Sequence, residues 1–193
     1  MRPAKISDER LFQGLSDVFR RKGYDGASYS DLMKATGLVK ASLYHRFPGG
    51  KAEMVDAILS TVDRHFAEYV LKPASEEGRP RDRARKIGRR LREFYDSGRR
   101  WCLLDTLTLA DSPSTRAHAR RSMEFWIDAF ARLSRDAGLS PAIARKRAQE
   151  AVVAIEGGLV VSRVLNNPRP FLRSLANLPK QLTVGRVQES SRL

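Results

Sequence analysis

The side chains best suited to chemistry in this chain are the basic and hydroxyl groups of one short segment, SYSDLMKATGLVKASLYHRFPGGK, at residues 28–51. Two short helices are expected to meet there at Gly37-Leu38-Val39, where a small residue permits a tight bend and an apolar residue packs inward. The spacing predicts an inner face of Leu32, Leu38, Leu43 and Phe47. This corner is typical of a helix-turn-helix, whose second helix enters the major groove of DNA.

The outer face of the second short helix is predicted to bind DNA. A face of small and polar side chains can fit against base edges, and this one carries Lys40, Ala41, Ser42, Tyr44, His45 and Arg46. Lys51 opens the following helix, where free backbone N–H groups and an ammonium can converge on one phosphate. The alternative for the corner is an ordinary pair of packed helices joined by a glycine turn. The alternative for Lys51 is a lysine in contact only with solvent.

Catalytic and metal-binding patterns are not found in the sequence. The three histidines, His45, His65 and His118, have no metal-ligand spacing. We find no nucleophile elbow, phosphate loop or paired-glycine fingerprint. We therefore expect no enzyme activity, no cofactor and no metal. The main alternative is a small helical enzyme or binding protein whose N-terminal corner is only structural.

The elements that must position this segment are helices, because apolar residues recur at helical spacing and no run alternates with period two. A first helix carries Leu11, Leu15, Val18 and Phe19 and is expected to end at Gly23. Ser28 and Asp31 have the spacing of a capping box for the second helix. The third runs from about Lys40 to Phe47, where Pro48-Gly49-Gly50 stops it.

The rest of the chain is predicted to add about six more helices, giving an all-α protein of about nine. A connecting helix spans residues 51–71, and the polar stretch from Ala74 to Pro80 follows it. The next segments are Arg81–Ser97, Trp101–Ala110, Ser114–Ala137, Pro141–Leu165 with Ser140 as N-cap, and a last helix holding Phe171, Leu172, Leu175 and Leu178. We expect residues 1–50 to form the DNA-binding domain and residues 51–193 an effector-binding and dimerisation domain.

Charge supports an anionic partner but does not locate it. The net charge is +14, yet residues 1–71 contribute only +2, and the densest basic run is Arg79–Arg100. That run is a solvated helix face, a nonspecific DNA surface or a membrane-binding surface. The absence of exposed Trp or Phe opposite the arginines argues against the membrane. The single cysteine, Cys102, and the lack of a signal-like or spanning apolar segment favour a cytoplasmic location.

At residues 28–51 the sequence resembles the TetR family of repressors. The matching residues are Ser28, Asp31-Leu32, Gly37-Leu38, Leu43-Tyr44-His45-Arg46-Phe47 and Lys51. The variant Ser-Leu-Tyr-His-Arg-Phe-Pro-Gly-Gly-Lys and, more weakly, Cys102-Leu103-Leu104 are similar to the LmrA/YxaF-like branch. The resemblance implies a homodimer that binds a double-stranded operator and responds to a small-molecule effector.

The resemblance also implies roles for single residues. Ser28 and Tyr29 would contact phosphate, and Lys40, Ala41 and Ser42 would face base edges. Tyr44 and Lys51 would clamp the backbone, with His45 or Arg46 assisting. Val39 departs from the family pattern, because its side chain cannot cap the recognition helix.

In the C-terminal portion the resemblance implies an apolar or aromatic effector. The candidate lining residues are Phe94, Trp101, Met123, Trp126 and Phe130, with Glu156 as a polar group in the cavity. Each is also explained as core, or, for Glu156, as a residue at the edge of the core. Apolar residues in Ala151–Leu165, around Gly157-Gly158, and in Phe171–Leu182 indicate a dimer interface or a buried helix within one chain.

Overall fold

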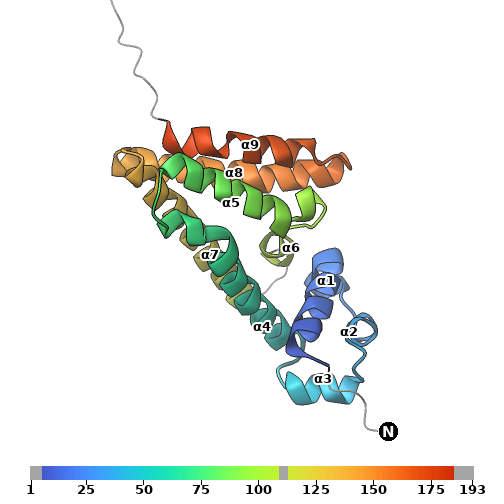
Figure 1. Ribbon diagram of the computed structural model, residues 1–193. Coiled ribbons are helices and arrows are strands. Elements are labelled where there is room, and N and C mark those ends of the chain that lie inside the picture. The colour runs from blue at the N-terminus through green and yellow to red at the C-terminus, as the bar shows by residue number, and fades with distance from the viewer. Residues whose placement is uncertain (1–5, 109–112, 185–193) are drawn as a thin grey trace, which may run out of the picture. The chain divides into compact units, whose positions relative to one another are not determined.

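The computed structural model describes residues 6–108 and 113–184 of the chain. Within these ranges it contains nine α-helices, short 3-10 and π-helical segments and no β-strand, which confirms the predicted all-α class (Figure 1). The helices form two compact units. One comprises the described residues up to Phe66 together with Trp101–Ser122, and the other comprises Ala67–Arg100 together with the described residues from Met123 onward.

The first unit is built on α1 (Asp8–Gly26), which packs against α2 (Tyr29–Thr36), α4 (Gly50–His65) and α6 (Leu103–Thr108). Helix α3 (Lys40–Arg46), the predicted recognition helix, follows α2 at the predicted corner (Figure 1). Leu32, Leu43 and Phe47 are buried as predicted, whereas Leu38 is half-buried. The predicted end of the α6 segment at Ala110 lies outside the described residues.

Most of the helix starts and ends predicted from local sequence signals agree with the structure. Ser28 and Asp31 form the predicted capping box, and Gly37 ends α2 in the left-handed region with φ 70°. Val39 makes no side-chain cap, as expected. Gly23 (φ 69°) interrupts α1, but the helix extends to Gly26 instead of ending there. Ser140 precedes the first residue of α8 without a side-chain hydrogen bond to the helix.

The first turns of α7 (Pro113–Asp136) belong to the first unit, where two of their side chains are bonded to α4. His118 Nε2 lies 2.8 Å from Asp63 Oδ2, and the Ser122 hydroxyl donates to the same oxygen at 2.5 Å. One carboxylate of α4 therefore holds two side chains that lie one helical turn apart on α7.

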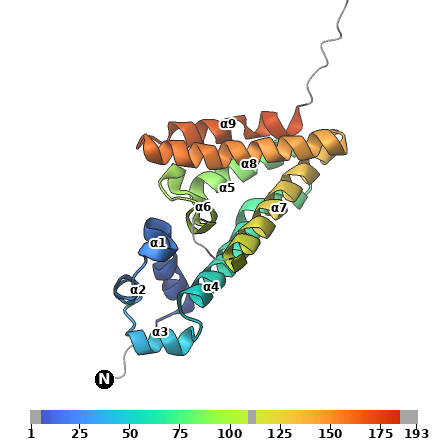
Figure 2. The same ribbon diagram turned by 180° about the vertical axis from the view of Figure 1, so that it is seen from behind.

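The second unit contains α5 (Pro80–Phe94), α8 (Pro141–Val164) and α9 (Arg169–Thr183), with the later turns of α7. Helix α9 packs along both α5 and α8, and α8 and α9 lie side by side in both views (Figure 2). Gly158 permits this approach, because a Cβ there would lie 3.0 Å from the Phe171 Cα. Val152, Ile155 and Leu159 are buried within the chain.

The predicted single helix over residues 51–71 changes register near its end. After His65 the chain continues as a π-helix, Phe66–Leu71, and then as a 3-10 turn, Lys72–Ser75. Arg90 of α5 donates to the Tyr69 carbonyl at 2.6 Å and lies over the Tyr69 ring at 5.1 Å. A tertiary hydrogen bond of this kind can support a local departure from the α-helical bonding pattern. No helix in the described ranges is long and apolar enough to cross a membrane.

Candidate nucleic-acid interface

One face of α3 is exposed and carries six of the side chains expected to approach DNA. Leu43 is fully buried and Phe47 nearly so, which fixes the rotation of the helix. The opposite side faces solvent, and six of its side chains are exposed: Lys40, Ala41, Ser42, Tyr44, His45 and Arg46. Val39, just before the helix, is 61% exposed. The arrangement leaves a short, convex helical surface free to contact another molecule.

Two tyrosines from different helices stack beside this face. The rings of Tyr29, at the start of α2, and Tyr44, on α3, are nearly parallel, at 14°, with centroids 5.1 Å apart. The Lys40 ammonium lies over both rings, 5.4 Å from the Tyr29 centroid and 5.8 Å from that of Tyr44. Burial, followed by the hydrogen bond with Tyr44, raises the pKa of Tyr29 to about 12.

The Tyr29 phenol lies against the first turn of α4, beside the Gly50 backbone. The nearby Lys51 backbone N–H partly opposes the rise in the pKa of Tyr29. A Cβ at Gly50 would lie 3.0 Å from the Tyr29 oxygen, and Gly50 has a φ of +68°. Glycine at this position therefore satisfies both the left-handed backbone and the close phenol.

The Lys51 ammonium is bonded within the protein. It donates to the carbonyl oxygens of Tyr24 at 2.8 Å and Ala27 at 3.2 Å, and lies 4.7 Å from the Tyr24 ring centroid. Sequence reasoning expected this group at a phosphate and missed its protein partners. The signal was the glycine pair Gly23 and Gly26, because an interrupted helix end leaves carbonyls without helical partners.

Two other predicted DNA contacts also have partners in the structure. The Ser28 hydroxyl accepts from the Asp31 backbone N–H and donates to the Asp31 carboxylate at 2.6 Å. The Lys22 ammonium and Ser28 together lower the pKa of Asp31 to about 2. Arg46 pairs with Asp8 of α1 at 2.7 Å, with both side chains exposed. Such a surface pair is weak, so Arg46 can exchange this partner for another at little cost.

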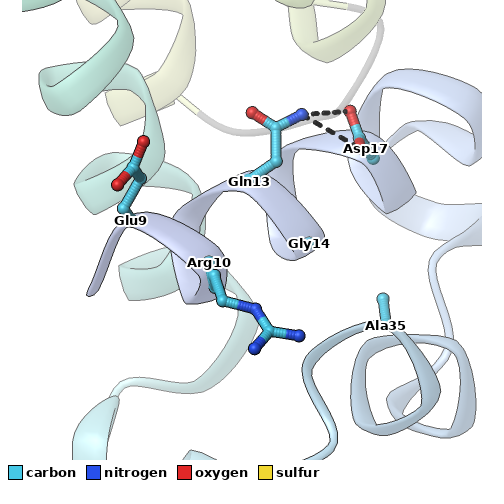
Figure 3. Close-up of a pocket in the computed structure, with 6 residues that line it drawn as sticks. All are labelled: Glu9, Arg10, Gln13, Gly14, Asp17 and Ala35. Carbon is cyan, nitrogen blue, oxygen red and sulfur yellow. Dashed lines mark hydrogen bonds between the residues drawn. The ribbon is translucent and has the colours of Figure 1, made fainter. Parts of the chain in front are cut away.

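A polar groove lies where α1 crosses α2 (Figure 3). Helix α1 comes close here because of Gly14, where a Cβ would lie 2.7 Å from the Ala35 carbonyl oxygen. The groove has a volume of about 500 Å³ and is lined by Glu9, Arg10, Gln13, Gly14, Asp17 and Ala35. Gln13 donates to both carboxylate oxygens of Asp17, at 3.0 and 3.1 Å. Two carboxylates against one guanidinium make this groove a poor phosphate site.

The basic run Arg79–Arg100 is used in part to hold the second unit together. Arg83 is buried and bonds the Pro73 carbonyl at 3.0 Å and Asp136 at 2.8 Å. Lys86 pairs with Glu76 at 2.5 Å. Arg90 donates a hydrogen bond to the Tyr69 carbonyl. Arg81 and Arg89 are exposed on α5. Much of this charge therefore has a structural use, which weakens the argument that the run forms a DNA surface.

The residues predicted to line an effector cavity are divided between the two units. Trp126 and Phe130 are buried, and Phe94, Met123 and Glu156 are half-buried, all in the second unit. Phe94 packs edge-on against Tyr95 at 5.0 Å, as part of a cluster with Phe171. Trp101 is half-buried in the first unit, where its carbonyl accepts a 2.8 Å hydrogen bond from Arg20.

Two ranges of the chain match known protein families. Residues 13–58 match the family described as "Bacterial regulatory proteins, tetR family", and residues 77–176 match "Transcriptional regulator LmrA/YxaF-like, C-terminal domain". The HTH-type transcriptional regulator LmrA of Bacillus subtilis is 22% identical over 181 residues, which cover 91% of this chain and 96% of that protein.

Solved structures share the fold. A TetR transcriptional regulator from Legionella pneumophila has a TM-score of 0.81 at 20% identity, covering 95% of this chain and 100% of the other. The regulator CifR, as a cysteine mutant complexed with a 26-bp operator duplex, has a TM-score of 0.74 at 24% identity, covering 94% of this chain and 98% of the other.

Proposed function

The chain belongs to the TetR family of bacterial transcription regulators, in its LmrA/YxaF-like branch, and from this we propose that it is a ligand-responsive repressor that binds a palindromic operator as a homodimer. Members of this family are DNA-binding regulators and not enzymes. The proposal adds the repressor role, the symmetry of the site, the dimer and the effector.

The exposed face of α3 is the observation that carries the DNA-binding assignment. Lys40, Ala41 and Ser42 occupy its first turn, the part of a recognition helix that reaches base edges. Tyr44 is 41% exposed beside them and offers a phenol to the phosphate backbone. Tyr29 and the start of α4 lie next to Tyr44, so phosphate contacts are expected on that side.

The roles of the remaining candidates differ in strength. His45 is exposed on α3 and suits an assisting contact. Arg46 must first leave Asp8, which costs little because the pair is solvated. The Ser28 hydroxyl already serves the capping box, so its phosphate contact would be an additional one. For Lys51 to clamp the backbone, its ammonium would have to leave the Tyr24 and Ala27 carbonyls.

The dimer is proposed to form through an apolar stripe on α8. Val153, Val161 and Val164 are 70, 44 and 75% exposed, and Val160 is also exposed. These residues recur at helical spacing around Gly157, where a Cβ would meet nothing within 4 Å. An exposed apolar stripe of this kind is typical of a protein–protein interface. In a two-fold dimer it would face its own copy.

The effector is proposed to be a small apolar or aromatic molecule held in the C-terminal portion. Trp126, Phe130 and Met123 succeed one another at helical spacing on α7, and Phe94 and Glu156 come from α5 and α8 of the same unit. Trp101 belongs to the first unit, just before α6. Binding would favour a state with lower operator affinity, and so release DNA in the cytoplasm.

Selection of binding sites from random duplexes by the full-length protein tests the proposal. We expect an inverted repeat whose half-sites are about one helical turn, ~34–36 Å, apart. Lys40→Ala should cost about 1–3 kcal/mol on the selected site and relax the preference at one base position. Lys180→Ala, which removes an exposed lysine of α9, is the matched control.

The competing account assigns DNA binding to α5. Under that account Arg81→Gln with Arg89→Gln would abolish binding, while Lys40→Ala would leave it unchanged. Such a result, or the absence of any preferred sequence, would contradict the proposed function.

A further inference from the structure

The Lys40 ammonium is held in place by side chains from two other positions. It lies 5.4 Å from the Tyr29 ring centroid and 5.8 Å from that of Tyr44, within the range of a cation–π contact with each. A lysine side chain has four flexible carbons and normally samples many rotamers. Here the two rings favour the rotamers of Lys40 that keep its ammonium at the first turn of α3.

The two rings are themselves fixed. Tyr29 stacks on Tyr44 at 5.1 Å, and its phenol lies against the start of α4 at Gly50. Gly50 leaves room for that phenol, because a Cβ there would be only 3.0 Å from it. The chain of contacts thus runs from the start of α4 through Tyr29 of α2 to Tyr44 and Lys40, which both lie on α3.

We propose that Tyr29 is a positioning residue for sequence discrimination, which acts through Lys40. This inference rests on the proposed function, in which Lys40 reads a base edge. A pre-positioned ammonium loses less freedom on binding the correct base than a free one does. The aromatic face of Tyr29 would therefore set the selectivity at one base pair, while its hydroxyl supports affinity for any duplex.

Substitutions can separate these two functions of Tyr29. Tyr29→Leu removes the ring, whereas Tyr29→Phe keeps the ring and removes the hydroxyl. Lys40→Met removes the charge and keeps a side chain of similar shape. The measured quantity is the ratio of affinities for the selected duplex and for the same duplex with the Lys40-dependent base pair exchanged. Lys34→Met, an exposed lysine of α2, is the control.

Tyr29→Leu is expected to lower this ratio by about two- to fivefold, the equivalent of one exposed cation–π contact. Tyr29→Phe should keep the ratio and weaken binding to both duplexes alike. In the double variant Tyr29→Leu/Lys40→Met, the ratio should be no lower than in Lys40→Met alone, because the ring acts through the lysine.

Two results would overturn the inference: an unchanged ratio in Tyr29→Leu, or independent, multiplying losses in the double variant. If Tyr29→Leu fails to fold, as judged by thermal melting, Tyr44→Leu carries the test, because it removes the other ring and leaves the contact with α4. If Lys40→Met itself keeps the ratio of the parent protein, the reading role in the proposed function has failed. If only the tyrosine variants keep it, the positioning role alone has failed.

Discussion

The ammonium nitrogen of Lys51 lies 2.8 Å from the carbonyl oxygen of Tyr24, and this hydrogen bond ties the first turn of α4 to the end of α1. The same ammonium bonds the Ala27 carbonyl, so it spans the interrupted end of α1. A charged donor is well suited to satisfying two carbonyls that have no helical partners. Lys51 therefore has a structural use whether or not it also meets phosphate.

Lys51→Met is expected to lower the free energy of unfolding by about 1–2 kcal/mol, because hydrogen bonds from a charged group are lost at a half-buried site. Urea denaturation followed by circular dichroism measures the change. Lys34→Met, which removes an exposed lysine, should leave the stability nearly unchanged. A Lys51→Met protein as stable as the parent but weaker on DNA would assign the ammonium to phosphate instead.

Asp31→Asn is expected to reduce stability in a pH-dependent way. Lys22 and Ser28 lower the pKa of Asp31 from 3.8 to about 2, so its ionised form is favoured in the folded state. The stabilisation is fully present above the unfolded value and is lost as the pH falls through about 2. Melting temperatures of parent and variant should differ above pH 4 and converge near pH 2. Asp25→Asn, which removes an equal charge at an exposed position, is the control.

Substitutions at the adjacent residues Gly157 and Gly158 should have different consequences. Gly158→Leu is expected to destabilise the protein, because its side chain would collide with the Phe171 backbone and the Ser174 hydroxyl. Gly157→Arg, together with Val153→Glu, should leave the fold intact and yield monomers in sedimentation at micromolar concentrations. Phe125→Ser removes an exposed apolar residue of α7 and should remain dimeric. A dimer that survives the α8 substitutions would move the interface elsewhere.

Asp8→Asn is expected to strengthen nonspecific DNA binding. The variant frees Arg46 from its 2.7 Å ion pair and removes a negative charge near α3. If Arg46 then engages a phosphate, the slope of log affinity against log salt should steepen by up to about one. Fluorescence anisotropy at several salt concentrations provides the measurement. Asp25→Asn changes the net charge equally, so equal slopes in the two variants would exclude a specific effect through Arg46.

Trp126→Phe tests the effector site. Trp126 is 4% exposed, so the phenyl ring is a milder replacement than Ala and should preserve the fold. We expect an effector concentration for half-release of DNA about fivefold higher than in the parent, equal to about 1 kcal/mol of lost apolar contact. DNA binding without effector should be unchanged. An effector response identical to that of the parent would place the pocket away from Trp126.

Much of the fold could be predicted from the sequence because its signals are local. The spacing of Leu32, Leu43 and Phe47 determines which side of each short helix is buried, and therefore which side of α3 is exposed. Ser28 and Asp31 specify a helix start through atoms only three residues apart. Gly37 specifies a helix end through its own backbone. None of these requires knowledge of a distant part of the chain.

The partners of the flexible side chains were decided by tertiary structure. The ammonium groups of Lys40 and Lys51 can reach many positions, and their choice depends on the tyrosines and carbonyls that other helices bring near. Gly157 and Gly158 are neighbours in the sequence but lie about 100° apart around the helix axis. Only the packing of α8 against α9 determines that Gly158 is buried and Gly157 faces outward.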